Sequence, residues 1–435
     1  MSKPVSFFWC RRDLRLHDNT ALFHALNSGV PVQAVFIFDS DILDELEDKR
    51  DRRLVFIHEQ LEKINQQLKE YGARLLVEYG KPMDVWKTLC DKYSIKAVFV
   101  NGDYEPYAFR RDKIISEFLQ TKKIDFYSYK DQVIFEKDEV TKDDGNPYTV
   151  FTPYSKKWKA AIRNNSFSAI PSEKLVANFN KTKSGKVLSL SAIGFEMFRY
   201  NFPSSVLDKS ILQKYAEQRD LPAVNGTSRL SVHLRFGTVS IRELFRQAWA
   251  VSEKWTNELI WREFYMSILW HFPHVEINSF KQAYDRLRWH HDEPGFQKWC
   301  DGQTGYPIVD AGMRELNETG FMHNRVRMIT ATFLTKYLLI DWRWGEAYFA
   351  KKLLDFDMAA NNGGWQWSAG TGVDAAPYFR IFSMDSQTKR FDPDFEYINK
   401  WVPEFGSFDY PDPIVDYSFA RKRCLDFYKS GLERA

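Results

Sequence analysis

The first 130 residues alternate short apolar runs with longer stretches in which apolar side chains recur at helical spacing. The apolar runs are rich in Val, Phe and Ile and cover residues 5–9, 32–39, 73–79 and 97–101. The helical patterns cover residues 51–71, 83–93 and 107–121. This alternation predicts an α/β domain, with a doubly wound parallel sheet, over residues 1–130.

Beyond residue 130 the pattern changes twice. Residues 131–204 carry scattered Lys, Ser, Asn and Pro with weak periodicity, which predicts a long connecting segment over the surface. Residues 205–435 read as helical throughout, with the strongest apolar stripes over 257–272 and 323–340. We therefore expect an all-α domain there, and two domains agree with a length of 435 residues.

Composition narrows the function classes. The net charge is only +3, so a nucleic-acid surface must be local. The four cysteines lie far apart and have no metal-ligand spacing, which predicts a cytoplasmic protein without a metal site. No signal peptide or bilayer-spanning run is visible, so we expect no membrane partner. No Gly-x-Gly-x-x-Gly follows the first strand, which argues against a nicotinamide-dependent dehydrogenase.

The most informative segment is residues 355–367, Asp-Phe-Asp-Met-Ala-Ala-Asn-Asn-Gly-Gly-Trp-Gln-Trp. Its small residues would let a flat ligand approach the backbone. Asn361 and Trp365 share a helix face, whereas Trp367 lies roughly 200° further around. The ordinary alternative is a helix with two core tryptophans, but a Gly-Gly pair costs helix stability with no evident packing return.

The chain resembles the photolyase/cryptochrome family, in which this segment matches the heart of the flavin site. Further matching motifs occur in order along the chain, at residues 11–19, 226–231, 261–265, 304–311 and 322–328. Within the family it looks most like the class I cyclobutane pyrimidine dimer photolyases. The resemblance implies FAD as cofactor, an antenna-type domain over 1–130 and an FAD-binding catalytic domain over 205–435. It also implies light-driven repair of pyrimidine dimers in DNA by electron donation from photoexcited reduced FAD.

The resemblance assigns flavin contacts residue by residue. Taken alone, residues 226–231 offer hydroxyls and backbone N–H groups at a helix start, which suits either an anion site or a capping turn. Arg327 and Asp355 look like a charge pair, and Asn361 would face the flavin nitrogen that is protonated on one-electron reduction. The full set is Tyr215, Thr227, Ser228, Leu230, Ser231, Arg262, Arg327, Asp355, Asp357 and Asn361.

A relay and a lesion pocket are also implied. Trp365, Trp342 and Trp289 match the three-tryptophan relay of the family, although each alone would be assigned to the core. The lesion pocket for a flipped-out dimer would use Glu258, Trp261, Asn324, Met328 and Trp367. Glu258 and Asn324 would act on the lesion, with Glu258 stabilising or protonating its radical anion. Positive residues around the cavity mouth would be Arg219, Arg262, Arg325 and Arg380.

The second, antenna chromophore stays open between folate and deazaflavin. Folate-binding relatives carry Cys-Lys where this chain has Val275-Glu276, and Asp103 and Glu105 resemble acidic contacts of deazaflavin-binding members. We expect a monomer whose partner is dimer-containing DNA. The alternatives are a cryptochrome photoreceptor, a six-four photolyase and a light-independent flavoprotein. The six-four members share a His pair where this chain has His323-Asn324.

Overall fold

The computed structural model describes residues 3–163, 167–183 and 185–433, which form two compact units. The chain contributes several segments to each unit. The first unit comprises residues 1–136, 162–207 and 229–250, and the second comprises 137–161, 208–228 and 251–435. Residues 1–2 and 434–435, at the ends of the predicted domain ranges, lie outside the described residues.

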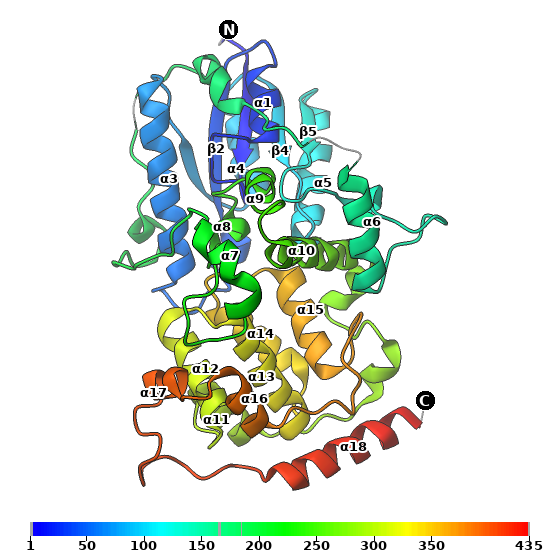
Figure 1. Ribbon diagram of the computed structural model, residues 1–435. Helices are drawn as coiled ribbons and strands as arrows, with labels where there is room; N and C mark the ends of the chain where they lie inside the picture. Colours follow the sequence, from blue (N-terminus) through cyan, green and yellow to red (C-terminus); the bar gives the residue numbers. More distant parts are fainter. Residues whose placement is uncertain (1–2, 164–166, 184, 434–435) are drawn as a thin grey trace. The chain divides into compact units, whose positions relative to one another are not determined.

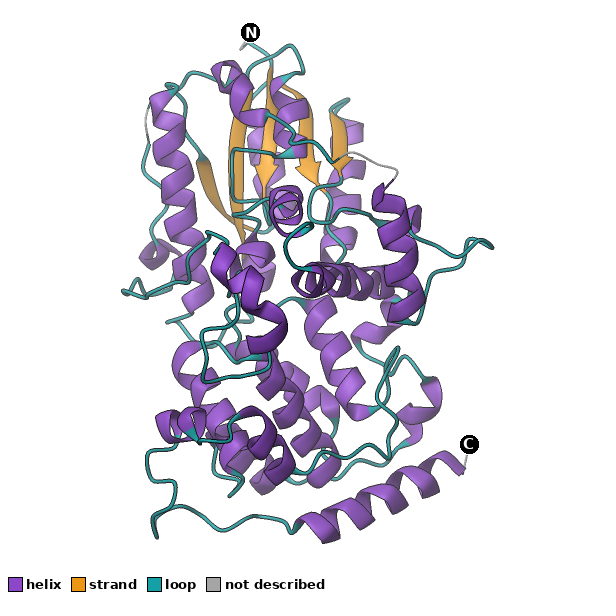
Figure 2. Cartoon of the chain, viewed as in Figure 1, coloured by secondary structure: helices purple, strands orange, loops and turns teal. Residues whose placement is uncertain are grey.

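The first unit is built on a five-stranded parallel sheet with the strand order β3-β2-β1-β4-β5 (Figures 1 and 2). The strands are β1 (Val5–Cys10), β2 (Val32–Asp39), β3 (Leu76–Gly80), β4 (Ile95–Asn101) and β5 (Asp125–Tyr129). The predicted doubly wound α/β domain is thereby confirmed. The four predicted strands are present, because each is a short apolar run with helix signals on either side.

Three helices lie where the apolar periodicity predicts them, namely α3 (Arg52–Glu70), α4 (Pro82–Lys92) and α5 (Pro106–Thr121). Two shorter helices, α1 (Thr20–Leu26) and α2 (Ser40–Leu43), were not predicted. Asp51 caps α3 by accepting a bond from the Arg53 backbone N–H at 2.8 Å, and prolines open α4 and α5. Alternate β1 side chains, Phe7 and Trp9, pack on Trp86 of α4, which buries one face of the sheet.

Strand β5 was not predicted from the sequence. It lies at the edge of the sheet and pairs only with β4 among the described strands. Most of its side chains are exposed or half-buried, so its sequence, Asp-Phe-Tyr-Ser-Tyr, lacks a continuous apolar run. Edge strands are held by backbone pairing more than by burial, which explains why the hydrophobic pattern missed it.

The second unit is helical, as predicted for most of the C-terminal part. Its helices are α6 (Phe151–Arg163, through residue 161), α7 (Lys209–Gln218), α10 (Glu253–His271), α11 (Glu293–Asp301), α12 (Pro307–Thr319), α13 (Asn324–Thr332), α14 (Trp342–Lys352), α15 (Met358–Ala369), α16 (Met384–Phe391), α17 (Glu396–Trp401) and α18 (Tyr417–Glu433). A π-helical stretch, Phe333–Tyr337, continues α13. Two helices of the first unit, α8 (Ser231–Phe236) and α9 (Ile241–Ala248), also fall in this range of the sequence.

Helix α6 lies within residues 131–204, where the sequence predicted only a connecting segment. Phe151, Tyr154 and Trp158 give this helix one aromatic face.

Across the described part of the chain, no helix combines the length and apolar character needed to cross a membrane.

Candidate active site

Helix α15 carries the small-residue segment and begins at a predicted acid. Asp357 is its N-cap, with the carboxylate accepting a bond from the Ala360 backbone N–H at 3.2 Å. A Cβ on Gly363 would lie 2.2 Å from the Tyr265 ring, whereas one on Gly364 would meet nothing within 4 Å. The expectation that the Gly-Gly pair has no packing return is wrong for Gly363, which lets α15 lie against α10. Gly364 leaves space for a ligand.

The space beside Gly364 is a cavity formed by α13, α14, α15 and the residues just before α15. Its walls include seven residues predicted from the sequence, namely Asn324, Arg327, Met328, Asp355, Asp357, Asn361 and Trp365. Four of these belong to the predicted flavin set, two to the predicted lesion set and one to the predicted relay. Predicted residues 41 positions apart in the sequence, Asn324 and Trp365, therefore line one cavity, whereas the predicted lesion residues Glu258, Trp261 and Trp367 are not among its walls.

The predicted charge pair is present on this wall. Arg327 Nη2 lies 2.9 Å and 3.1 Å from the two carboxylate oxygens of Asp355, and Arg327 Nε donates to the Met322 carbonyl at 2.8 Å. The Asp355 side chain is more buried than its partner. A charge-assisted pair with an additional backbone contact fixes the guanidinium in one orientation beside the cavity.

Asn361 is oriented by a carboxyl group that the sequence analysis missed. Its Nδ2 donates to Glu346 Oε1 at 2.8 Å and to the Glu346 carbonyl at 3.1 Å. Burial raises the pKa of the Glu346 carboxyl, and the Asn361 bond opposes this effect. Glu346 lies on α14, fifteen residues before Asn361, and no local pattern links the two positions. With its nitrogen held in this way, the amide is presented to the cavity in a fixed orientation.

The cavity suits a flat ring with a polar edge. Ser368 Oγ lies in its wall, is buried, and has no hydrogen-bond partner among the described residues. A buried hydroxyl without a partner is costly, so a ligand atom that bonds to it would remove that cost. Gly364 supplies open space on the same wall. Arg327, Asp355 and Asn361 line this space together with Ser368, and their role as contacts of the isoalloxazine ring of FAD stays a prediction.

The three tryptophans predicted to form a relay all belong to the second unit. Trp365 and Trp342 are only 2% and 1% exposed, while Trp289 is half-buried. Gly345, one turn after Trp342 on α14, touches Trp365 so closely that a Cβ there would lie 2.0 Å from Cη2. Trp289 adjoins the chain just before Trp342, because the His290 N–H donates to the Leu339 carbonyl at 2.8 Å.

Both buried indoles of the predicted relay have an unpaired nitrogen. Neither Trp365 Nε1 nor Trp342 Nε1 has a hydrogen-bond partner among the described residues. By contrast, Trp299, which packs edge-on against Trp365 at 5.9 Å, donates its indole N–H to the Thr330 carbonyl at 3.1 Å. Buried tryptophans usually satisfy this donor, but Trp9, Trp86 and Trp401 also lack a partner for it among the described residues, so the unpaired nitrogens do not by themselves mark the predicted relay.

The predicted lesion residues on α10 carry a further ion pair. Glu258 and Trp261 are both half-buried, and Arg219 Nη1 forms a short contact with Glu258 Oε1. Burial raises the pKa of the Glu258 carboxyl, although the Arg219 charge and hydrogen bond oppose it. The Arg219 guanidinium also lies over the Tyr215 ring, 5.4 Å from its centroid. Glu258 is thus an acid whose proton affinity is set by burial and by one arginine.

The predicted rim arginines have different environments. Arg219 is engaged by Glu258, and Arg325 Nη2 donates to Asp220 Oδ1 at 2.8 Å. The Arg325 guanidinium also lies 4.4 Å from the Phe391 ring centroid. Arg380 is exposed, Arg262 is half-buried on α10, and Trp367 is half-buried on α15. The sequence did not reveal that carboxylates of the protein already hold two of the four arginines.

The predicted phosphate-binding residues are divided between the two units. Tyr215, Thr227 and Ser228 belong to the second unit, where Ser228 Oγ accepts a bond from Trp255 Nε1 at 3.2 Å. Leu230 and Ser231 belong to the first unit, with Leu230 as the buried N-cap of α8 and Ser231 as its first residue. The role of these five residues stays a prediction.

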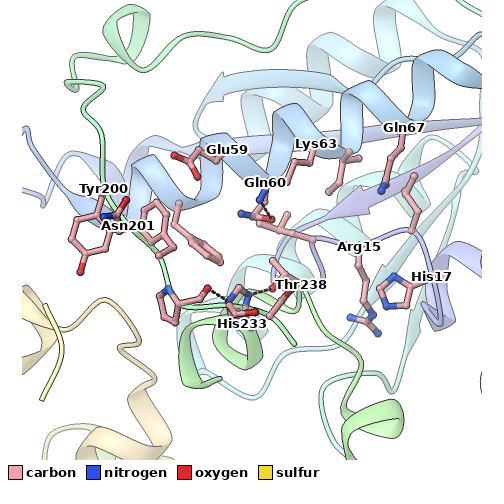
Figure 3. A pocket seen from close by; sticks show the side chains of 18 residues that line it. Arg15, His17, Glu59, Gln60, Lys63, Gln67, Tyr200, Asn201, His233 and Thr238 are labelled. Atoms are coloured by element: carbon pink, nitrogen blue, oxygen red, sulfur yellow. Dashed lines mark hydrogen bonds between the residues drawn. The ribbon is translucent and has the colours of Figure 1, made fainter. Parts of the chain in front are cut away.

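The first unit contains a larger cavity of about 720 Å³, which none of the predicted site residues lines (Figure 3). Glu59, Gln60, Lys63 and Gln67 project into it from α3. Across from them His233 bonds to Thr238 Oγ1 at 2.7 Å and to the Pro203 carbonyl at 2.8 Å. Burial lowers the pKa of His233, so the ring is a neutral structural bridge between two segments.

A second cavity in this unit holds the acids that resemble deazaflavin contacts. Its walls include Trp9, Arg12, Asp103, Glu105 and Arg235. Arg12 Nη1 lies 3.1 Å from Asp103 and 3.0 Å from Glu105, and Arg235 lies 2.5 Å from Glu105. Burial would raise the pKa of Asp103, but the neighbouring arginines hold it well below its usual value. Both carboxylates are therefore already paired with arginines of the same cavity.

The chain matches two family profiles. Residues 6–174 match the family described as DNA photolyase, and residues 255–409 match the FAD binding domain of DNA photolyase. A curated relative, the deoxyribodipyrimidine photo-lyase of Synechococcus sp., is 36% identical over 98% of this chain and 97% of its own length.

Solved structures give the same result. A bacterial class III photolyase from Agrobacterium tumefaciens aligns with a TM-score of 0.87 and 31% identity, over 100% of this chain and 98% of its own. An archaeal photolyase from Sulfolobus tokodaii with two FAD molecules aligns with a TM-score of 0.82 and 32% identity, over 98% of this chain and 100% of its own. A Synechocystis cryptochrome aligns with a TM-score of 0.85 and 25% identity, over 98% of this chain and 99% of its own. The chain therefore belongs to the photolyase/cryptochrome family, and FAD is its cofactor.

Proposed function

We propose that this protein repairs cyclobutane pyrimidine dimers in DNA, using light absorbed by its reduced FAD. The observation that carries the proposal is the composition of one cavity wall. Asn324 and Met328, expected to hold the lesion, line the same cavity as Arg327, Asp355 and Asn361, expected to hold the flavin. Electron transfer between two bound groups needs such proximity, and a protein that only sensed light would need no lesion pocket beside its flavin.

When bound, reduced FAD would supply the excited-state electron for splitting the dimer and would receive it back, so the reaction would have no net redox change. The protein residues bind, orient and protonate. The Arg327–Asp355 pair and the Glu346-bound Asn361 amide fix the cofactor edge. Trp261 and Trp367 supply aromatic walls, which can offset the unstacking cost of a flipped base by roughly 1–3 kcal/mol each. Glu258 is the acid available at the lesion.

The test of this function is lesion choice under illumination. A six-four photoproduct needs proton movement between its bases, yet His323 Nδ1 accepts a bond from the Arg325 N–H at 3.1 Å, and the next residue is an amide. An amide cannot act as an acid near neutral pH. We expect the reduced protein to repair cyclobutane dimers in blue light, to do nothing in the dark, and to leave six-four photoproducts unchanged.

Both lesions are placed in the same oligonucleotide sequence, and the products are separated by chromatography after equal exposures. Repair of the six-four product at a comparable rate would contradict the role given to Asn324. Repair of neither lesion by protein shown to contain reduced FAD would favour the alternative, a cryptochrome-type blue-light photoreceptor. The similarity to a Synechocystis cryptochrome is the observation that favours this alternative.

Glu258→Gln should lower the repair yield several-fold while changing the affinity for dimer-containing DNA little. Glutamine keeps the size and one hydrogen bond to Arg219, but it removes the proton and the charge. Quantum yield and dissociation constant are measured on the same preparation of reduced protein. Arg219→Gln is the matched control: it removes the group that opposes the burial effect on Glu258 and keeps the carboxyl. An unchanged yield in Glu258→Gln refutes its role at the lesion.

A further inference from the structure

Helix α6 lies against α10 through an aromatic face that the sequence analysis did not single out. Trp158 donates its indole N–H to Glu263 Oε2 at 2.6 Å, and both side chains are buried. One turn earlier, Tyr154 packs on Phe264, with ring centroids 5.3 Å apart. The buried Trp158–Glu263 bond fixes α6 along α10 and determines where its first residue, Phe151, must lie.

Phe151 lies directly on Trp261. The ring centroids are 3.6 Å apart and the planes differ by only 4°, so one ring covers the other almost completely. Aromatic pairs left to themselves prefer offset or edge-on arrangements to a full face-to-face overlap. The overlap is therefore imposed by the anchoring of α6 on α10. It covers one face of the Trp261 indole and leaves the other face available.

This geometry has a consequence for the lesion pocket. Because Phe151 covers one face of the indole, a base that stacks on Trp261 must use the other face. Phe264 meets the Trp261 ring edge-on at 5.7 Å, and Tyr265 lies 5.6 Å away at an angle of 31°. Three rings therefore hold the indole plane before any substrate arrives, and a side chain held in its bound rotamer loses less entropy on binding.

We propose that Phe151 is a positioning residue for the lesion, acting by fixing the plane and the available face of Trp261. The inference rests on the proposed function, since it concerns the substrate of that site. Phe151 does not itself touch the base. It selects for a dimer because the fixed indole accepts a flat, flipped-out base in one orientation, whereas phosphate contacts of undamaged DNA do not use this face.

The test compares three variants of the full-length protein with FAD bound. Phe151→Leu keeps bulk but removes the ring, and Phe151→Tyr keeps the ring. Tyr154→Leu is the matched control, because it removes a ring from the same face of α6 that packs on Phe264. Affinities for a dimer-containing and an undamaged oligonucleotide are measured by fluorescence anisotropy in the dark, and the unfolding midpoint of each variant is recorded.

We expect Phe151→Leu to bind dimer-containing DNA roughly three- to tenfold more weakly, the cost of ordering one aromatic side chain. Its affinity for undamaged DNA should stay within about twofold. Phe151→Tyr should restore the preference, and Tyr154→Leu should keep it even if its unfolding midpoint falls. Equal losses on both DNAs, the same loss of preference in Tyr154→Leu, or no loss in Phe151→Leu would overturn the positioning role. A wild-type protein without any preference for dimers would instead refute the proposed function, and this inference with it.

Discussion

The Trp365→Phe protein, prepared with oxidised flavin, should remain oxidised under blue light in the presence of an external reductant, whereas the wild type should become reduced. Trp365 lines the cavity expected to hold the flavin, and only 2% of its surface is exposed. Phenylalanine is much harder to oxidise than tryptophan. The initial rate should fall by an order of magnitude or more, because each 1.4 kcal/mol added to a barrier slows a step about tenfold. Absorption spectra recorded during illumination measure this initial rate of flavin reduction.

Phenylalanine suits this position because Trp365 already lies against Gly345 with no space to spare, and the smaller ring introduces no clash. Trp299→Phe is the control, since Trp299 is equally buried and packs on Trp365 but is not part of the proposed relay. It should photoreduce normally. Trp365→Phe protein that has been reduced chemically should still repair dimers. Loss of repair in that state would mean that Trp365 holds the site together, and normal photoreduction would mean that electrons reach the flavin by another route.

Lys336→Met should stabilise the protein at pH 6, and the gain should disappear above about pH 10.5. Lys336 is only 1% exposed, and its Nζ donates to the Ala369 carbonyl at 2.9 Å and lies 3.9 Å from the centroid of the Tyr428 ring. Among the described residues no carboxylate forms an ion pair with it. Burial lowers the pKa of Lys336 to about 7, with small effects from Cys424 and Lys281.

The direction in which stability changes with pH follows from the number of protons bound by the folded and the unfolded protein. Between pH 7 and the ordinary lysine pKa of about 10.4, the unfolded chain holds this proton and the folded protein releases it, so stability rises with pH. Below pH 7 the folded protein carries the full cost of the buried charge, at most about 4–5 kcal/mol. Methionine removes that cost but loses one hydrogen bond and one cation–π contact. We expect a net gain of about 2–3 kcal/mol at pH 6.

The variant leaves no unpaired acceptor, because the Ala369 carbonyl also accepts a bond from the Tyr428 hydroxyl at 2.8 Å. Urea unfolding with equal excess FAD is compared at pH 6 and pH 10.5, since bound cofactor itself shifts the midpoint. Lys400→Met is the control: Lys400 is exposed, and its Nζ lies 4.8 Å from the centroid of the Trp401 ring. A gain that is independent of pH, or a loss at pH 6, would contradict the argument.

Hydrophobic periodicity predicted most of the fold because it is a local property. The four apolar runs became β1 to β4, and the stripe over 257–272 became α10. Two of the elements that it missed have identifiable physical reasons. Strand β5 is an edge strand with little burial, and the three aromatic side chains of α6 are separated by Thr-Pro and Ser-Lys-Lys, which obscure their helical spacing.

The sequence predicted only those site residues that lie within a recognisable motif. Residues within one motif, such as Asp355, Asp357 and Asn361, came from the sequence as a group. Their partners from other segments did not: Glu346 holds Asn361, and Arg219 reaches Glu258 from 39 residues away. Such pairs depend on how helices pack, and a polar residue on a half-buried helix looks the same in the sequence whether or not it has a partner.

The unpaired indole nitrogens of Trp365 and Trp342 determine how charge and protons would separate. A tryptophan that loses an electron becomes a strong acid, but an N–H without an acceptor has nowhere to send its proton. In the proposed relay the proton would therefore stay at these two positions while the electron vacancy moves on, which would keep the inner steps reversible. Of the three proposed relay residues, half-buried Trp289 is the one at which water could take the proton. Proton loss at the solvent-exposed end would thus make the charge separation irreversible, whereas the buried positions would only pass the electron vacancy on.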